Sequence, residues 1–356
     1  MALTVGTLVA ASAVAVESGN DHRVTQVRER LAVAEAEGAS GVLRISIHGR
    51  LFFESGFGSA SCTADEPVTP DHVFMIGSIT KVFTRVLGFV LEEKGIFSLD
   101  DKVADHLPGF PGPIGAVTLN QLMNHTGGLP DLIDEQGRPV SYSVEYDYIP
   151  VTRDELIERA GLAALIAEPG QKEEYSNLGY QLLAAIYEVA TGESYPDLLR
   201  RYIYEPAGMT NTDFWFADNT QREFADGCRT KNVRWGNPAD DQMWGEEGPS
   251  WNLIGAGGLL STSESLSMFF EGIGRGIFFD SPEQSEKFKA QRMVFSNRLQ
   301  QRVMGPAGSN GIFNAVGYWA DDDRFCVVLL TNRADHPGED ELIRDIIGMF
   351  PAESLH

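Results

Sequence analysis

Strand-forming segments stand near both ends of this chain, and helix-forming segments fill the middle. Residues 41–61, "GVLRISIHGRLFFESGFGSAS", give two β-rich runs separated by His48, Gly49 and Arg50, which predicts a hairpin. Residues 313–333, "FNAVGYWADDDRFCVVLLTNR", give two further strands joined by an acidic turn. A sheet built from both chain ends, with helices inserted between them, is the simplest packing of this pattern.

Helical patterns occupy most of the remaining chain. Residues 24–37 end at Gly38, and the apolar residues between Ser78 and Gly95 recur at helical spacing. We therefore predict an α/β fold in which helices flank an antiparallel sheet. The expected sheet domain comprises residues 20–75 and 250–356, the mainly helical domain comprises residues 76–249, and the active site lies between them.

The charge of the chain excludes some classes of partner. The 356 residues carry a formal net charge of −23, which repels nucleic-acid phosphates and anionic membranes. We expect no nucleic acid and no membrane as partner. The histidines form no H-E-x-x-H or other close ligand pair, so we also expect no metal and no cofactor.

Cysteine usage and the N-terminus bear on the cellular compartment. Three widely spaced cysteines, Cys62, Cys228 and Cys326, predict no disulfide framework, and Cys326 is expected in the core. Residues 1–20 are apolar with small residues, as in a signal peptide, but no basic residue precedes the apolar run. We expect a cytoplasmic enzyme, with a secreted or periplasmic protein as the alternative.

Ser78 and Lys81 form the only S-x-x-K in the chain. Three residues are about one helical turn, so the two side chains share a face, and the serine lies near the positive end of the helix dipole. A lysine in that position can accept the serine proton if its pKa is depressed. The same four residues also describe a serine N-cap followed by an exposed lysine.

Tyr175 and Asn177 form the only Y-x-N, in a polar loop just before a helix. A phenol can act as a general base or acid if a cation lowers its pKa, and an amide can hold a lysine or a substrate carbonyl. Taken alone, this pair is better explained by a tyrosine packed at a helix start, with the asparagine as cap.

Together, and in this order, the two motifs resemble those of the serine β-lactamase and penicillin-binding protein superfamily. The closest likeness is to its class C-like branch, which includes class C β-lactamases, related D-Ala-D-Ala carboxypeptidases and family VIII carboxylesterases. Segments such as "VTLNQLMNHTGGLPD", "PGQKEEYSNLGYQLLAAIYEVATGESY" and "GAGGLLSTSESLSMF" match the family pattern in order, and the resemblance covers about residues 24–350.

The resemblance implies a role for each motif residue. Ser78 matches the acylated nucleophile, Lys81 the lysine that activates it, and Tyr175 the tyrosine that shares the base role and protonates the leaving group. Asn177 matches the amide that contacts the lysine and the substrate. His125, in "NHTGGLP", matches a recurrent family histidine that we interpret as structural.

The third family motif departs from the pattern. Pro306, Ala307 and Gly308 stand where the family has Lys-Thr-Gly or His-x-Gly. Gly308 still permits close approach of substrate, and the N–H of Ser309 can pair with that of Ser78 as an oxyanion hole. Proline supplies no charge, and one lost charged hydrogen bond to a substrate carboxylate costs about 1.5–3 kcal/mol.

These observations predict a serine hydrolase that acts through an acyl-enzyme on a small-molecule ester or amide. The missing cation ranks carboxylesterase first, acyltransferase second, and β-lactamase or D-amino-acid peptidase third. A non-catalytic binding protein of the same fold is the alternative from another class. Trp251, before a glycine-rich loop, is expected either to border the acyl pocket or to anchor the loop as a buried aromatic.

Overall fold

The computed structural model describes most of the chain. The described residues are 21–143, 146, 149–214, 222–230, 233–236, 244–245, 248–321, 324–333 and 338–355. Residues 1–20, on which the expected location rests, lie outside them. So do residues 322 and 323 of the predicted acidic turn.

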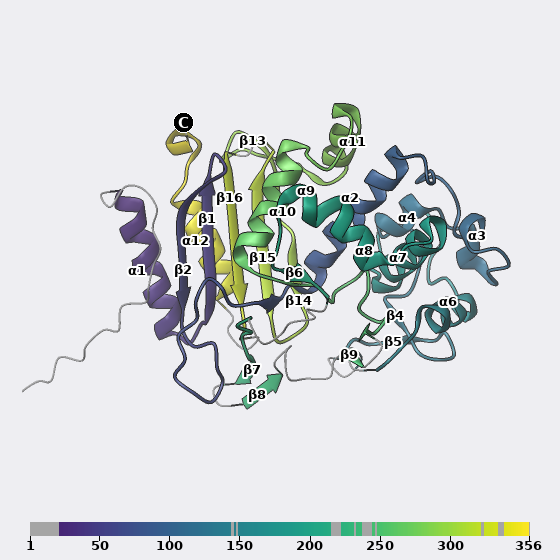
Figure 1. The fold of residues 1–356 in the computed structure, drawn as a ribbon, viewed down its shortest axis with the longest axis horizontal. Coiled ribbons are helices and arrows are strands. Elements are labelled where there is room, and N and C mark those ends of the chain that lie inside the picture. The colour runs from purple at the N-terminus through teal and green to yellow at the C-terminus, as the bar shows by residue number, and fades with distance from the viewer. Residues whose placement is uncertain are drawn as a thin grey trace, which may run out of the picture.

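Strands from the two chain ends lie side by side in one antiparallel sheet, as predicted (Figure 1). The order is β12-β13-β15-β16-β1-β2, with β14 also paired to β15. The bounds are β1 Gly41–Ile47, β2 Arg50–Phe57, β12 Val294–Ser296, β13 Gln301–Met304, β14 Ala307–Ser309, β15 Asn314–Ala320 and β16 Phe325–Thr331. The sheet therefore brings the N-terminal hairpin directly against the C-terminal one.

The residue pattern explains which strands are central. Every residue of β16 is buried, and β1 pairs with it from Gly41 opposite Thr331 to Ile47 opposite Phe325. The β1–β2 turn has His48 at φ 52° and Gly49 at φ 66°, as a tight hairpin with two left-handed residues requires. The predicted hairpin is confirmed.

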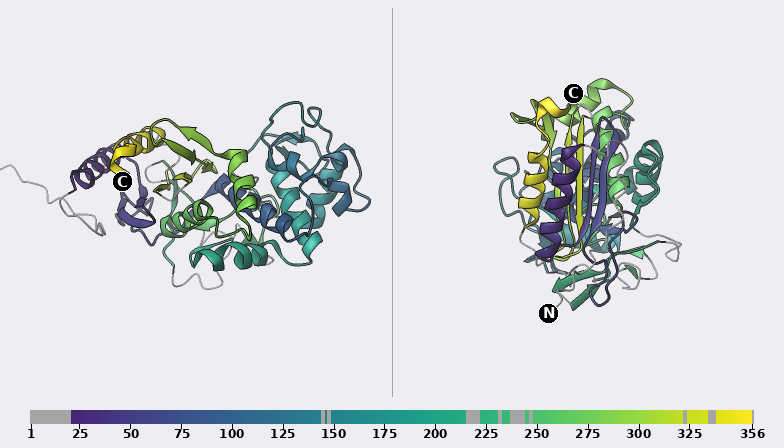
Figure 2. Two further views of the ribbon diagram at one scale, coloured as in Figure 1. Left: turned by 90° about the horizontal axis from the view of Figure 1, so that it is seen from above. Right: turned by 90° about the vertical axis from the view of Figure 1, so that its left-hand side faces the viewer.

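Helices cover both faces of the sheet. The helices α1 (His22–Ala36) and α12 (Glu339–Gly348) lie together on one face, over a core that includes Leu31, Phe53 and Ile346 (Figure 2). The helix α10 (Ser263–Arg275) packs against β1, β15 and β16 on the other face. The sheet is thereby shielded from water on both sides.

The remaining helices gather beside the sheet, at the right of Figure 1. Their bounds are α2 Thr80–Glu93, α3 Val103–His106, α4 Leu119–Met123, α6 Arg153–Leu162, α7 Asn177–Thr191, α8 Tyr195–Leu199, α9 Glu205–Ala207 and α11 Pro282–Arg292. The chain also has 3₁₀ turns at Gly77–Ile79, Pro113–Ala116 and Ala352–Leu355, and a π-helical turn at Arg200–Tyr204. The division at residues 76 and 249 stays a prediction.

Short strands complete the fold. A three-stranded sheet joins β3 Phe74–Met75, β11 Leu260–Ser261 and β6 Thr212–Asp213. The two-stranded pairs are β4 Leu132–Ile133 with β5 Pro139–Val140, β7 Gly227–Thr230 with β8 Val233–Gly236, and β9 Trp244–Gly245 with β10 Gly248–Pro249. Because β3 ends just before the turn at Gly77–Ile79, this small sheet fixes the start of α2.

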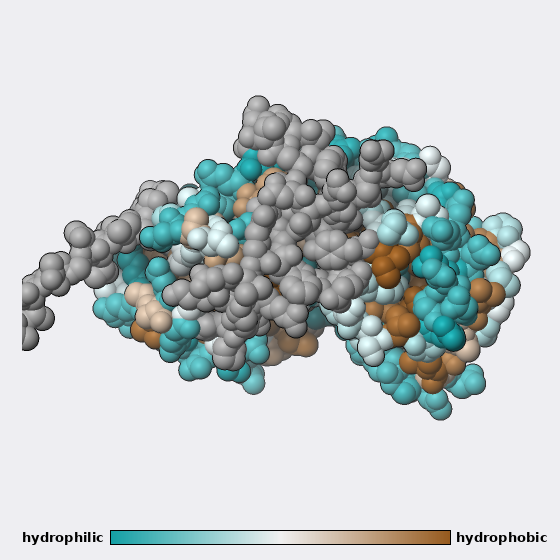
Figure 3. All heavy atoms as spheres, turned by 90° about the horizontal axis from the view of Figure 1, so that it is seen from below, coloured by the Kyte–Doolittle hydropathy of each residue, from teal (hydrophilic) through white to brown (hydrophobic). Residues whose placement is uncertain are grey.

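The described surface is mainly hydrophilic in the view of Figure 3, with small apolar patches over the helical part. Such a surface fits the strongly negative net charge. Among the described residues, no helix has both the length and the apolar character needed to cross a membrane.

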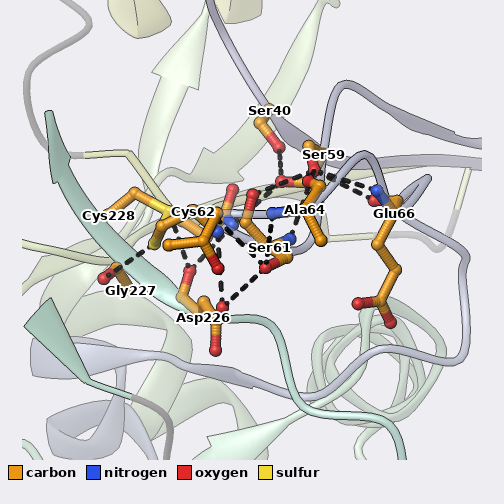
Figure 4. Close-up of a disulfide and its surroundings, with 11 residues drawn as sticks. Ser40, Ser59, Ser61, Cys62, Ala64, Glu66, Asp226, Gly227 and Cys228 are labelled. Atoms are coloured by element: carbon orange, nitrogen blue, oxygen red, sulfur yellow. Dashed lines mark hydrogen bonds between the residues drawn. A yellow bond between two sulfur atoms is a disulfide. The ribbon is translucent and has the colours of Figure 1, made fainter. Parts of the chain in front are cut away.

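The expectation about cysteines is wrong at one point. Cys62 and Cys228 form a disulfide, although 166 residues separate them in sequence (Figure 4). The Asp226 carboxylate accepts the N–H of Cys62, and the N–H of Cys228 donates to the Asn332 carbonyl, which fixes the bridge beside the end of β16. Sequence spacing could not reveal this pairing because only the tertiary fold brings the two segments together. Cys326 is buried and unbridged, as expected.

Removing the disulfide is expected to destabilise the fold. Replacing both Cys62 and Cys228 by Ser should lower the free energy of unfolding by about 2–5 kcal/mol, because the unfolded chain regains conformational entropy. Denaturant unfolding of the variant and of the unreduced protein measures the difference. Cys326→Ser is the control for a thiol outside the bridge. Two alkylatable thiols at positions 62 and 228 in the unreduced protein would contradict the bond.

Candidate active site

Ser78 and Lys81 lie on one face of the segment that leads into α2. The 3₁₀ turn Gly77–Ile79 carries Ser78, and Lys81 follows in the first turn of α2. Lys81 is only 6% exposed, and it belongs to a stretch of α2, from Thr80 to Leu91, in which every residue is buried. The alternative of an exposed lysine behind a serine cap does not hold, and no side chain caps this helix.

The Lys81 amine is held by acceptors from three segments. Nζ lies 2.6 Å from the Asn177 Oδ1, 2.7 Å from the Ala256 carbonyl and 3.0 Å from the Ser78 Oγ. The first two partners can only accept, whereas a hydroxyl can also donate. In the neutral amine, two N–H groups therefore point to Asn177 and Ala256, and the lone pair faces the Ser78 hydroxyl. This is the geometry of a base that removes the serine proton.

The orientation of Asn177 is fixed from behind. Its Nδ2 donates to the Asp131 Oδ1 at 2.8 Å, and its backbone N–H donates to the same oxygen at 2.9 Å. Since the amide nitrogen is engaged there, Oδ1 must face Lys81. Sequence reasoning did not single out Asp131, although it ends the quoted family segment "VTLNQLMNHTGGLPD".

The hydroxyl of Tyr175 forms a hydrogen bond with the hydroxyl of Ser78. The Tyr175 Oη and the Ser78 Oγ are 2.6 Å apart, and Lys81 Nζ lies 4.9 Å from the centre of the phenol ring. Tyr175 is 48% exposed as a residue, and its hydroxyl lies within hydrogen-bond distance of Ser78. Desolvation raises its pKa to about 12, the hydrogen bond to Ser78 offsets part of this, and the charge of Asp131 adds to it. The condition that a cation lowers this pKa is therefore not met, and Tyr175 is a neutral phenol at rest, fit to donate a proton.

Strand β14 borders the serine at very close range. A Cβ atom on Gly308 would lie 2.1 Å from the Ile76 carbonyl oxygen and 2.8 Å from the Ser78 nitrogen. Gly308 thus admits the backbone of the nucleophile turn, and the expected close approach of substrate at this residue stays a prediction. The adjacent Ser309 pairs with Asn314 on β15 and lines the cavity beside Ser78. The N–H groups of Ser78 and Ser309 are the expected pair of oxyanion donors.

Pro306 sits at a position that tolerates proline. It directly precedes β14, and its carbonyl accepts the N–H of Gly317 at 3.0 Å. Proline lacks only the N–H, so the strand start keeps its hydrogen bond. Pro306 therefore keeps the main-chain hydrogen bond to β15 but supplies no positive charge to the site.

A cavity of about 410 Å³ opens beside Ser78. Its described lining is Ser78, Tyr175, the β14 residues Ala307, Gly308 and Ser309, the β15 residues Asn314, Ala315 and Val316, and the α12 residues Glu339 and Asp340. None of these side chains is positively charged. Burial raises the pKa of Glu339, and hydrogen bonds from Thr331 and Asn314 offset part of that rise. Sequence reasoning missed both carboxyl groups because α12 reaches the cavity only through the fold.

Trp251 lies elsewhere than along this cavity. It is 9% exposed and belongs to the main apolar core. Its backbone N–H donates to the Val151 carbonyl at 2.9 Å. The described lining of the cavity does not include it. The structure therefore fits the alternative in which this large ring anchors its loop out of water.

His125 packs behind Tyr175, with 4.7 Å between the ring centres. It is 8% exposed. Burial, followed by the positive charges of Lys81, Arg292 and Arg85, lowers its pKa to about 3, so its ring is neutral. Among the described residues, no group of three or more His, Cys, Asp or Glu side chains could hold a metal ion.

The sequence of this chain matches a protein family and several bacterial relatives. A sequence profile described as Beta-lactamase matches residues 27–347. The chain is 31% identical over 298 residues to the putative penicillin-binding protein PbpX of Bacillus subtilis (strain 168), covering 83% of this chain and 71% of that protein. It is 37% identical over 177 residues to another penicillin-binding protein of that strain, covering 49% of this chain and 37% of that protein.

Solved structures share the architecture. An octameric penicillin-binding protein homologue from Pyrococcus abyssi is 25% identical, with a TM-score of 0.70 over 93% of this chain and 75% of that one. A class C beta-lactamase, 16% identical, has a TM-score of 0.73 over 94% and 98% of the two chains. A D-amino acid amidase from Ochrobactrum anthropi, 21% identical, has a TM-score of 0.73 over 92% and 98%. The last two show the fold alone, which is that of the class C beta-lactamase.

Gly308→Ala is expected to slow the reaction of Ser78 with a fluorophosphonate at least about hundredfold. The added Cβ collides with the backbone at Ile76 and Ser78, which displaces β14 and its oxyanion donor. The labelling rate, followed by mass spectrometry, measures the effect. Gly305→Ala is the control, since its nearest contact would be a Tyr318 side-chain atom at 3.3 Å. Equal rates for the two variants would refute the predicted role of β14.

Proposed function

The chain belongs to the beta-lactamase family, and from that premise we propose that it is a serine hydrolase with a preference for esters that lack a carboxylate. The observation that carries the proposal is the set of contacts at Ser78. Its hydroxyl lies 3.0 Å from the buried Lys81 amine and 2.6 Å from the Tyr175 phenol, within hydrogen-bond reach of a base and an acid at once.

The proposed reaction proceeds through an acyl-enzyme. Ser78 Oγ attacks the ester carbonyl while its proton passes to Lys81, and the N–H groups of Ser78 and Ser309 stabilise the oxyanion. The C–O bond to the leaving group then breaks, Tyr175 donates its proton to the leaving oxygen, and Lys81 returns the proton it holds to Tyr175. Water repeats these steps on the acyl-enzyme and releases the carboxylic acid.

The preference for esters without a carboxylate rests on the charges around the cavity. Position 306 supplies no cation, and the described lining carries the carboxyl groups of Glu339 and Asp340. A substrate carboxylate bound there would find no cation among the described lining residues, which weakens its binding. An uncharged ester avoids that cost.

One experiment tests both parts of the proposal. Hydrolysis of p-nitrophenyl butyrate is compared with that of p-nitrophenyl hemisuccinate, which carries a carboxylate on its acyl group. We expect kcat/KM at least about tenfold higher for the uncharged ester, the factor that one weakened charge contact gives. Ser78→Ala should abolish turnover, and a fluorophosphonate should modify Ser78 in the wild-type protein.

Variants at Pro306 isolate the charge effect. Pro306→His adds a group that can bear the missing charge and should raise kcat/KM for the hemisuccinate, whereas Pro306→Ala, the matched control, should not. Turnover of a chromogenic cephalosporin faster than that of the butyrate would overturn the ester preference. Absence of Ser78 labelling together with absence of ester turnover would overturn the hydrolase itself.

We also propose that the protein works in an oxidising compartment rather than the cytoplasm. Disulfides persist in oxidising surroundings and are reduced in most cytosols. The bond between Cys62 and Cys228 therefore supports an oxidising compartment. Alkylation of free thiols during lysis of the native cells, followed by mass spectrometry, should find both cysteines protected. Modification of both by the reagent would favour the cytoplasm.

A further inference from the structure

The loop that carries Tyr175 is held on both sides by one residue. The N–H of Glu174 donates to the His125 carbonyl at 2.7 Å, and the N–H of Ser176 donates to the His125 Nδ1 at 3.2 Å. These two bonds flank Tyr175 in sequence, so a shift of His125 moves the backbone on each side of the phenol.

The imidazole of His125 also supports the phenol ring directly. Its centre lies 4.7 Å from that of Tyr175 and 5.1 Å from that of Tyr180. Tyr180 is itself fixed, because its hydroxyl donates to the Met123 carbonyl at 2.7 Å, which also accepts from the buried Arg85 at 2.9 Å. The contacts form a continuous support from α2 through Tyr180 and His125 to Tyr175.

The protonation state of His125 suits this support. Because Nδ1 accepts the Ser176 N–H, a neutral ring carries its proton on Nε2. A protonated ring would present a donor to that N–H and break the bond. Burial and the positive charges of Lys81, Arg292 and Arg85 keep the ring neutral by lowering its pKa to about 3.

The backbone at His125 also carries strain. Its φ is 59°, in the left-handed region, which few residues other than glycine adopt and in which asparagine, aspartate and histidine are enriched. Strained positions of this kind persist where surrounding contacts demand them, often beside functional groups. The contacts that hold this conformation are the bond from Glu174 to the main-chain carbonyl, the bond from Ser176 to the side chain and the ring contact with Tyr175.

We propose that His125 is a positioning residue that holds the Tyr175 hydroxyl on Ser78 and touches no reacting atom itself. This inference rests on the proposed function, because it assigns His125 an effect on a proton donor of that reaction. It predicts that the contribution of His125 to catalysis is made through Tyr175.

A double-mutant cycle with Tyr175→Phe tests this proposal. His125→Gly accepts the left-handed backbone but removes the acceptor and the ring, and should lower kcat for p-nitrophenyl butyrate by about ten- to a hundredfold with little change in KM. In the Tyr175→Phe background, the same change should cost less than about threefold. His125→Asn, which tolerates the backbone and offers an acceptor oxygen, should recover part of the lost rate.

Assays well below each variant's Tm keep folding effects apart from the proposed role. An equal loss in both backgrounds would show a purely structural residue and overturn the proposal. If Tyr175→Phe has no measurable turnover, the ¹³Cζ chemical shift of Tyr175 decides: it should move in His125→Gly, and an unchanged shift refutes the proposal. Failure of wild-type ester turnover and Ser78 labelling would instead count against the proposed function.

Discussion

The buried amine of Lys81 is the constraint on which the rest of the site depends. A charged or polar nitrogen removed from water is tolerated only where hydrogen-bond partners replace the solvent. Here the partners come from the turn before α2 through Ser78, from the start of α7 through Asn177, and from the loop that holds Ala256. Satisfying one amine therefore fixes three segments relative to one another, and Ser78 lies at their junction.

The groups around the cavity differ in their protonation. Around the serine, burial keeps His125 neutral, and desolvation keeps the hydroxyl of Tyr175 protonated. Glu339 and Asp340 add carboxyl groups to the lining of the cavity. The groups beside the serine suit proton transfer, and the described lining of the cavity contains no cation.

Sequence reasoning was strongest where the signal was local. The strand patterns at both chain ends and the turn at His48 and Gly49 predicted the sheet and its first hairpin, and S-x-x-K spacing placed two side chains on one face. It was weakest where residues far apart in sequence meet. The disulfide between Cys62 and Cys228, the Asp131 contact that orients Asn177, and the burial of Trp251 all depend on such meetings.

The sequence by itself therefore determined the residue types available for the chemistry, the family motifs and the elements that carry them, because these follow from spacing and local periodicity. Only the tertiary structure decided that Tyr175 reaches Ser78, that its phenol has a raised pKa, and that acidic residues of α12 line the cavity. Each of these depends on burial and on neighbours from distant segments, which packing alone brings within a few ångströms.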